Sequence, residues 1–200
     1  VTYTLGACTP VDASGLIDIH LAPSVSVGDV TICDGETAQL NAILSLNDPS
    51  QSGGTFLWSN MANSQDINVS PSISGVYIVS YNVGGCLPAI DSATITVNPL
   101  PDASFSATLL EGCSPLTTQL NANYLSPAAI YLWELSDGQT LTGNPITPTF
   151  SNPGNYDVFL RVTSDLGCVD SLLIPNYIYV EEDPQAIFTS TPTVFKDLSE

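Results

Sequence analysis

The cysteines are the residues of this 200-residue sequence whose type and spacing most clearly indicate chemistry. They are Cys8, Cys33, Cys86, Cys113 and Cys168. Cys33 and Cys86 lie 53 residues apart, and Cys113 and Cys168 lie 55 residues apart. These matched intervals predict one disulfide in each of two successive domains, Cys33–Cys86 and Cys113–Cys168. Cys8 corresponds to the second member of a pair, so we expect its partner about 54 residues upstream, outside this sequence.

Metal binding is the alternative chemistry for these thiols. A zinc site needs clustered ligands, but the sequence has no Cys-x-x-Cys motif and only one histidine, His20. Disulfides are therefore favoured, and they imply an oxidising, extracellular compartment. Catalysis is disfavoured as well, because one histidine, Lys196 and Arg161 leave few candidates for a general base or an anion-stabilising group. We expect no catalytic residue and no cofactor.

The charge balance excludes further classes of function. Two basic residues against twenty acidic ones give 2 − 20 = −18. Such a surface repels phosphate backbones and anionic lipid headgroups, so we expect no nucleic-acid partner and no membrane insertion. The hydrophobic fraction of 44% still allows a buried core. No apolar run is long enough to cross a bilayer, and no signal peptide is apparent.

The elements that must position these cysteines are predicted to be strands. Ala93, Ile95 and Val97 alternate with Thr94 and Thr96, and several other segments show the same period of two. Gly-containing turn signals separate these segments: Asp34-Gly35, Gly53-Gly54, Gly84-Gly85, Asp137-Gly138 and Pro153-Gly154. Short strands at this spacing, with no helical pattern between them, predict an all-β chain of β-sandwich domains.

An internal repeat sets the domain organisation. Residues 3–10 resemble residues 81–88 at an offset of 78, and Pro101–Phe105 resembles Pro184–Phe188 at an offset of 83. The sequence therefore reads as part of a tandem array. We expect its segments to be the end of a preceding module (1–22), an immunoglobulin-like sandwich (23–99), a second sandwich (100–183) and the start of a further module (184–200).

Each predicted sandwich has one tryptophan between its two cysteines, Trp58 in the first and Trp133 in the second. A tryptophan in this position is typical of the core of an immunoglobulin-like sandwich. An exposed tryptophan that stacks on a sugar is the alternative. The equivalent positions of the two residues favour core packing.

The second sandwich resembles a polycystic-kidney-disease (PKD) domain over residues 102–182. Tyr131-Leu-Trp133-Glu-Leu135-Ser-Asp137-Gly138 is similar to the family's Tyr-x-Trp-x-Phe-Gly-Asp-Gly, with Ser136 where the family usually has glycine. Thr149-Phe150-Ser-Asn-Pro153-Gly154-Asn-Tyr156-Asp-Val158 is similar to its Thr-Tyr-x-x-Pro-Gly-x-Tyr-x-Val. We expect Asp137-Gly138 to turn one hairpin and Pro153-Gly154 to turn the next.

The cysteine-bearing segments around Cys113 and Cys168 resemble modules of large secreted surface proteins of Bacteroidetes-type bacteria. That resemblance implies a gliding or surface adhesin exported by type IX secretion, whose partners would be neighbouring modules, surface polysaccharide or other cells. Short proline-containing linkers imply an extended, semi-rigid shaft. The alternative is a spacer or carbohydrate-binding region of a secreted hydrolase, because PKD-like modules also occur in such enzymes.

Three further sites are candidates. The Asp-Ser-aliphatic sequences at Ser92 and Ser171 are similar to the O-glycosylation motif of Bacteroidetes, although Asp-Ser can equally begin a strand. The acidic run 181–183 could bind calcium at a module junction, but a solvated linker is favoured. Direct ligand binding would use exposed aromatic side chains, for which Phe159, Tyr177 and Tyr179 are the candidates.

Overall fold

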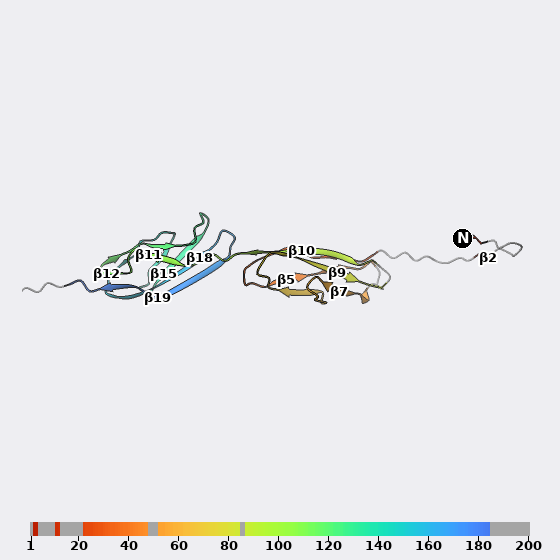
Figure 1. Cartoon of the computed structure of the whole chain (residues 1–200), viewed down its shortest axis with the longest axis horizontal. Helices are drawn as coiled ribbons and strands as arrows, with labels where there is room; N and C mark the ends of the chain where they lie inside the picture. The colour runs from red at the N-terminus through yellow and green to blue at the C-terminus, as the bar shows by residue number, and fades with distance from the viewer. Residues whose placement is uncertain (1, 4–10, 13–21, 48–51, 85–86, 185–200) are drawn as a thin grey trace, which may run out of the picture. The chain divides into compact units, whose positions relative to one another are not determined.

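The computed structural model describes residues 2–3, 11–12, 22–47, 52–84 and 87–184, and these residues form strands joined by turns and short connections. The chain divides into two compact units, residues 1–98 and 99–200 (Figure 1). The first unit begins with a two-stranded sheet of β1 (Thr2–Tyr3) and β2 (Val11–Asp12). The prediction of an all-β chain is confirmed.

The sandwich of the first unit, here called the first module, pairs a four-stranded sheet with two small sheets. The large sheet has the order β4-β10-β9-β7, and the small sheets are β3-β6 and β5-β8. The bounds are β3 Ser24–Ser26, β4 Val30–Cys33, β5 Ala38–Asn41, β6 Ile43–Ser45, β7 Thr55–Trp58, β8 Asp66–Val69, β9 Gly75–Asn82 and β10 Ala89–Asn98.

The sandwich of the second unit, here called the second module, has a five-stranded sheet of order β12-β19-β18-β15-β16. Two small sheets, β11-β14 and β13-β17, complete it. The bounds are β11 Phe105–Ala107, β12 Glu111–Cys113, β13 Leu116–Thr117, β14 Leu120–Ala122, β15 Ile130–Leu135, β16 Thr140–Thr142, β17 Thr149–Phe150, β18 Gly154–Thr163 and β19 Val169–Glu181.

Alternation along the strands builds one core in each module. In β15 the inward side chains are Tyr131, Trp133 and Leu135, and the residues between them are more exposed. Trp58 and Trp133 are 2% and 0% exposed, so the prediction that both lie in the core is confirmed. Each indole N–H also has a partner, because Trp58 donates to the Ser64 carbonyl at 2.8 Å and Trp133 to the Gly143 carbonyl at 2.9 Å.

The two turn predictions of the second module differ in outcome. Asp137-Gly138 does turn the β15–β16 hairpin, where Gly138 has a φ of 91° and donates its N–H to the Leu135 carbonyl. Pro153-Gly154 does not turn a hairpin. It joins β17 to β18, and β17 pairs with β13 in a different sheet, so the chain crosses from one sheet to the other at this point.

A register shift interrupts the long β18–β19 pair. Tyr156 pairs with Ile178 and Val158 with Ile174, so three residues of β19 oppose Asp157 alone. The shift contains Asn176, whose φ is 50°, and the Asn176 N–H donates to the Asp157 carboxylate at 2.8 Å. This bulge lets a strand of 13 residues that contains Pro175 remain paired along its length.

Thr118 ties the connection between β11 and β12 to the core of the second module. Its side chain is 2% exposed. The Thr118 hydroxyl accepts the Leu109 N–H at 3.0 Å and donates to the Leu109 carbonyl at 2.8 Å. One hydroxyl therefore satisfies both backbone groups of a residue that has no strand partner of its own.

Replacing Thr118 by valine is expected to lower the free energy of unfolding of the second module by about 1 to 2 kcal/mol, because the two Leu109 groups lose their partner while the side-chain volume is kept. Chemical denaturation measures this change. Thr117→Val is the matched control, since the Thr117 hydroxyl is exposed and meets only the Thr149 hydroxyl at 2.9 Å. An equal loss in both variants would contradict this role of the Thr118 hydroxyl.

Candidate functional site

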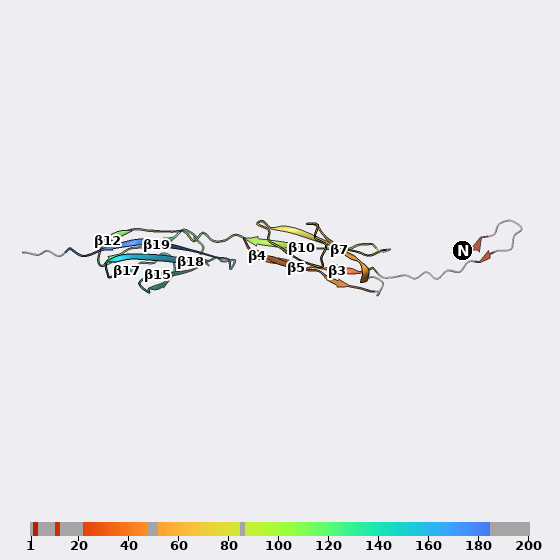
Figure 2. The same cartoon turned by 90° about the horizontal axis from the view of Figure 1, so that it is seen from below.

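The three described cysteines, Cys33, Cys113 and Cys168, lie at the ends of the modules. We call the end where the chain enters a module its leading end, and the end where its last strand stops its trailing end. In each module a short early strand lies parallel to the last strand, β4 beside β10 and β12 beside β19, and both figures of the whole chain show the second of these pairs (Figures 1 and 2).

The trailing ends of the two modules have the same backbone geometry around a cysteine. Cys33 pairs with Asn98, the last residue of β10, and Cys113 pairs with Glu181, the last residue of β19. The residue after each cysteine then donates its N–H to the carbonyl of that last residue, at 2.9 Å in both modules. Cys33 and Cys113 are therefore equivalent positions in the two modules.

Cys168 lies at the leading end of the second module, in the turn between β18 and β19. The Ser164 N–H donates to the Cys168 carbonyl at 2.8 Å, and the Cys168 N–H donates to the Ser164 hydroxyl at 3.1 Å. The incoming chain lies on the same side, because the Asn123 N–H donates to the Ser104 carbonyl at 2.9 Å. The next residue, Tyr124, donates its hydroxyl to Asp165 in this turn at 3.3 Å.

The predicted pairing of Cys113 with Cys168 is wrong. Cys113 is a free, exposed thiol, whereas Cys168 takes part in a disulfide. The reason is the length of β19, which has Cys168 just before its first residue and Cys113 opposite its last. Twelve residue steps along a strand cover about 40 Å, and a disulfide needs Cα atoms within about 7 Å.

Cys33 is disulfide-bonded, as predicted, but its predicted partner Cys86 lies outside the described residues, as Cys8 does. The pairing of Cys33 with Cys86 therefore stays a prediction.

The two serines proposed as glycan acceptors occupy corresponding places. Ser92 lies in β10, the second strand of the β9–β10 hairpin, and Ser171 lies in β19, the second strand of the β18–β19 hairpin. Both side chains are exposed. The aspartates that precede them have structural partners. The Asp91 carboxylate accepts the Val27 N–H at 2.9 Å, and the Asp170 carboxylate accepts the Ser171 N–H at 2.8 Å.

The three aromatic candidates for ligand binding differ in exposure. Tyr179 is 45% exposed, and Phe159 is half-buried. Tyr177 is not an exposed aromatic as expected, because its ring packs edge-on against Phe105 at 5.1 Å between centroids. Burial raises the pKa of Tyr177, with an opposing effect from a backbone hydrogen bond to Ala107.

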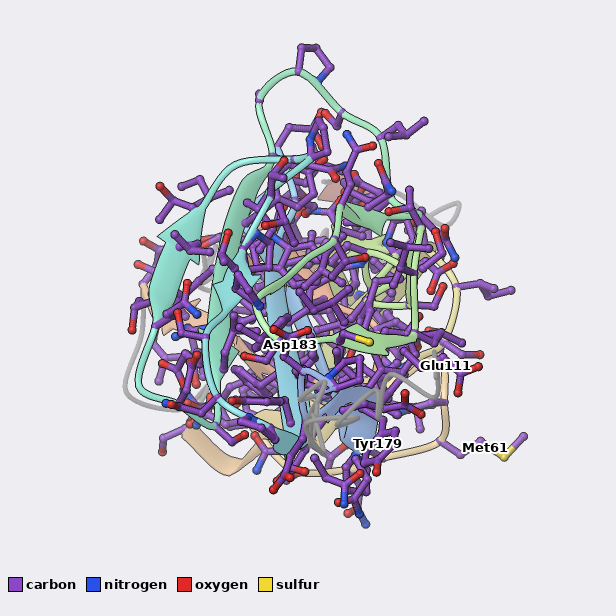
Figure 3. All side chains as sticks on the ribbon, turned by 90° about the vertical axis from the view of Figure 1, so that its left-hand side faces the viewer. Met61, Glu111, Tyr179 and Asp183 are labelled. Carbon is purple, nitrogen blue, oxygen red and sulfur yellow. The ribbon has the colours of Figure 1, made fainter. Side chains whose placement is uncertain are left out.

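The acidic run 181–183 is exposed, and Figure 3 views the trailing end of the second module with Glu111, Tyr179 and Asp183 labelled. Among the described residues, no group of three or more His, Cys, Asp and Glu side chains is arranged to hold a metal ion. The calcium hypothesis therefore has no preformed site in this part of the chain.

Two other polar groups have pKa values moved by their neighbours, and both lie at the leading end of the second module. Hydrogen bonds from the Ser104 hydroxyl and N–H lower the pKa of Asp102. The same hydrogen bonds hold the turn at the start of the module. Desolvation, followed by the charge of Asp165, raises the pKa of Tyr124. Both shifts favour the protonation states that make these hydrogen bonds at neutral pH.

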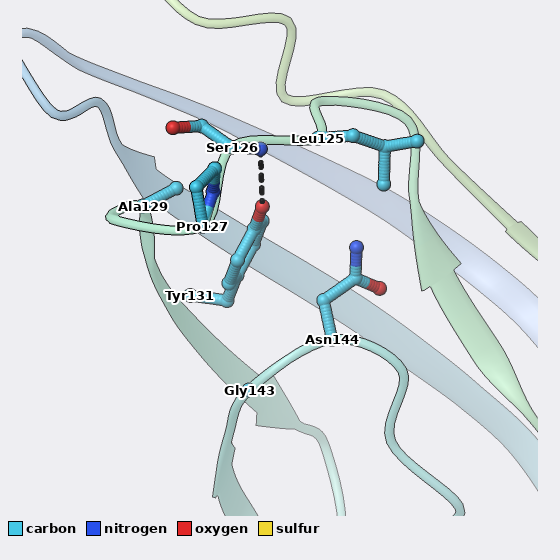
Figure 4. Close-up of a pocket in the computed structure, with 7 residues that line it drawn as sticks. All are labelled: Leu125, Ser126, Pro127, Ala129, Tyr131, Gly143 and Asn144. Carbon is cyan, nitrogen blue, oxygen red and sulfur yellow. Dashed lines mark hydrogen bonds between the residues drawn. The ribbon is translucent and has the colours of Figure 1, made fainter.

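An open pocket of about 430 Å³ lies beside the loop before β15 (Figure 4). Its lining is Leu125, Ser126, Pro127, Ala129, Tyr131, Gly143 and Asn144. The Tyr131 hydroxyl donates to the Tyr124 carbonyl at 2.8 Å and accepts the Ser126 N–H at 3.5 Å, so this phenol holds the loop in place. The lining has no carboxylate, histidine or cation and offers no set of catalytic groups.

No helix among the described residues is long and apolar enough to cross a membrane.

Solved structures and one family profile are similar to parts of this chain. No curated protein matches the sequence. Solved structures include the first two immunoglobulin domains of DIP-gamma, at 14% identity and a TM-score of 0.40 over 82% of this chain and 98% of that one. Murine CEACAM1b matches at 12% identity and a TM-score of 0.35, over 79% of this chain and 100% of that one.

The insect immune protein hemolin matches at 14% identity and a TM-score of 0.40, over 91% of this chain and 55% of that one. One family profile, described as "PKD domain", matches residues 96–178, which is most of the second module. The second module is thus similar to a PKD domain over residues 96–178, and both modules are β-sandwiches.

Proposed function

We propose that this chain is a segment of the structural shaft of a long extracellular adhesin or filament, in cell adhesion or surface motility. The observation that carries the proposal is the equivalence of the two trailing ends, where the same hydrogen bond follows Cys33 and Cys113. Two modules that end in the same way, each followed by a short segment containing proline, are typical of a repeated unit in an array.

The finer assignment follows from sequence resemblance and belongs to the same proposal. The shaft is that of a Bacteroidetes-type surface protein, located outside the cell, and residues 1–22 and 184–200 belong to the modules on either side. Its partners are neighbouring modules and surface polysaccharide or other cells, and Ser92 and Ser171 carry O-glycans. The exposure of both serines supports this last point.

Electron microscopy of the native molecule tests the proposal. An antibody against residues 100–183 should decorate a thin thread many modules long. A compact particle with a few modules beside a large globular domain would instead identify the chain as the spacer of a secreted hydrolase. The intact mass of native material tests the glycans separately, and a mass equal to that of the bare polypeptide would remove them from the proposal.

A further inference from the structure

We propose that the second module binds a sugar that carries one carboxylate, such as a uronic acid, on the outer face of its five-stranded sheet. Arg161 in β18 pairs with the carboxylate, and the sugar ring packs beside it. We call this surface the Arg161 face, and its residues are Leu132, Phe159, Arg161, Ser171 and Leu173. The proposal rests on the proposed function, because it gives a chemistry to the polysaccharide partner named there.

Alternation along β18 places Arg161 on the outer face of the sheet. Its neighbours in the strand, Leu160 and Val162, are 0% exposed, whereas Arg161 is exposed. Arg161 lies opposite Leu132 of β15 on one side and opposite Ser171 of β19 on the other. Residues directly opposite each other in antiparallel strands share a face, with Cβ atoms about 4.5 to 5.5 Å apart. The arginine therefore lies in the middle of the sheet, between an apolar and a hydroxyl side chain.

Phe159 provides an apolar surface beside this cation. It lies two residues before Arg161 on the same face of β18, is half-buried, and is opposite Leu173, which is 56% exposed. One face of a pyranose ring presents C–H groups, and packing them against an aromatic ring removes apolar surface from water. Phe159 is therefore the aromatic candidate that suits a charged sugar, because a guanidinium lies on the same face next to it.

The guanidinium of Arg161 forms no ion pair in the part of the chain that the structure describes. Glu134 lies on the same face, opposite Phe159, but the two charged side chains are not paired. Residues 99–184 contain ten acidic residues and one basic residue, which gives 1 − 10 = −9. An unpaired cation in so acidic a module is complementary to the carboxylate of a ligand, which a guanidinium binds through two parallel N–H···O hydrogen bonds.

Two features of the module favour a sugar over other anionic ligands. The first is the net charge of −9, which repels ligands with many negative charges, such as nucleic acids, sulfated polymers and acidic protein segments. The second is the position of β18 inside the sheet, between β15 and β19. An extended peptide binds a sheet through the main chain of an edge strand, whereas β18 is already paired on both sides. The Arg161 face therefore offers side chains alone, which suit the ring and the hydroxyls of a sugar.

An NMR titration of the 200-residue chain tests the proposal, because Arg161 is the only arginine of the sequence. Its side-chain Nε–Hε group gives a single signal in the ¹⁵N spectrum. The probe is methyl β-glucuronide. The matched neutral sugar is methyl β-glucoside, which has a hydroxymethyl group in place of the carboxylate. The chain is produced without glycans, because a glycan on Ser171 would cover the same face, and binding in the native molecule belongs to modules without that glycan.

We expect the glucuronide to shift the Arg161 Nε–Hε signal and the amide signals of Phe159 and Ser171 saturably, with a dissociation constant of about 1 to 10 mM. The glucoside should leave these signals unchanged. Arg161→Gln should weaken binding at least about tenfold, read from the amide signals, because the carboxylate loses its charged partner. Lys196→Gln is the matched control, since it removes the other basic residue of the sequence and should leave the affinity unchanged. Phe159→Leu should weaken binding of the glucuronide but not of acetate.

Several results would overturn the proposal. They are the absence of a saturable shift, equal shifts with the glucoside, and acetate binding as tightly as the glucuronide. A capped dipeptide with a free C-terminal carboxylate that bound more tightly than the glucuronide would also overturn it and would identify a protein partner. The titration is separate from the microscopy of the native molecule. A long thread without glucuronide binding would remove this proposal alone, and glucuronide binding by a compact particle would remove the shaft alone.

Discussion

Replacing Trp133 by alanine is expected to lower the free energy of unfolding of the second module by about 3 to 5 kcal/mol, the usual cost of truncating a large buried aromatic side chain. Trp133 is 0% exposed, and its indole packs edge-on against Phe105 at 5.3 Å between ring centroids. The variant leaves a cavity at the centre of the module and removes the hydrogen bond to the Gly143 carbonyl.

The two tryptophans make this measurement selective. In Trp133→Ala the only remaining indole is Trp58, so tryptophan fluorescence follows the first module alone while circular dichroism follows both. In guanidinium chloride we expect an unchanged fluorescence transition and a second transition, seen by circular dichroism, at lower denaturant. Trp58→Ala should reverse the assignment. If the Trp58 transition moved together with that of the second module in Trp133→Ala, the two cores would not be energetically separate.

The sequence was sufficient to predict the architecture of the modules because most of it depends on local pattern. The alternation of residues around Trp133 predicts which face of β15 points into the core, and Asp137-Gly138 predicts the β15–β16 hairpin that follows. Both are properties of a few adjacent residues and their own backbone. The Trp58 and Trp133 positions were predictable for the same reason, since each lies at a fixed place in a recurring strand.

The prediction of a Cys113–Cys168 disulfide failed because it depended on the two ends of the second module and not on local pattern. The similar spacing of Cys33–Cys86 and Cys113–Cys168 shows that cysteines occur at the same positions in successive modules. It does not show which of these cysteines lie close enough to form a disulfide. The parallel pairing of β12 with the last residues of β19 separates Cys113 from Cys168, because it places Cys113 beside Glu181, 68 residues further along the chain. No local signal marks that register, nor the bulge at Asn176 that determines where β19 ends.

Gly54 provides the other prediction of large effect. The sequence interpretation treated Gly53-Gly54 as a single turn signal, whereas the structure gives the two glycines different roles. A Cβ at Gly54 would overlap the Tyr81 ring and would lie 2.7 Å from the Asn82 carbonyl oxygen. A Cβ at Gly53 would have no neighbour within 4 Å. Gly54 also donates its N–H to the Tyr81 hydroxyl at 2.9 Å.

Gly54→Ala is therefore expected to lower the free energy of unfolding of the first module by about 2 to 3 kcal/mol, the sum of an overpacking cost and a weakened hydrogen bond. Tyr81 is 1% exposed and packs against Phe56, so its ring has little space to move away. Gly53→Ala should change stability by less than about 0.5 kcal/mol, as is usual at a surface position.

Chemical denaturation followed by Trp58 fluorescence, in a Trp133→Phe background, measures the difference in the free energy of unfolding of the first module between Gly53→Ala and Gly54→Ala. Tyr81→Phe separates the two causes, since it removes the hydroxyl and keeps the ring. If the hydrogen bond dominates, Tyr81→Phe will match Gly54→Ala, and the double variant will add little to either. If close approach dominates, as the 2.7 Å to a backbone oxygen indicates, Tyr81→Phe will cost about 1 kcal/mol and Gly54→Ala clearly more. Equal stability of Gly53→Ala and Gly54→Ala would contradict the predicted cost of placing a Cβ beside Tyr81 and Asn82.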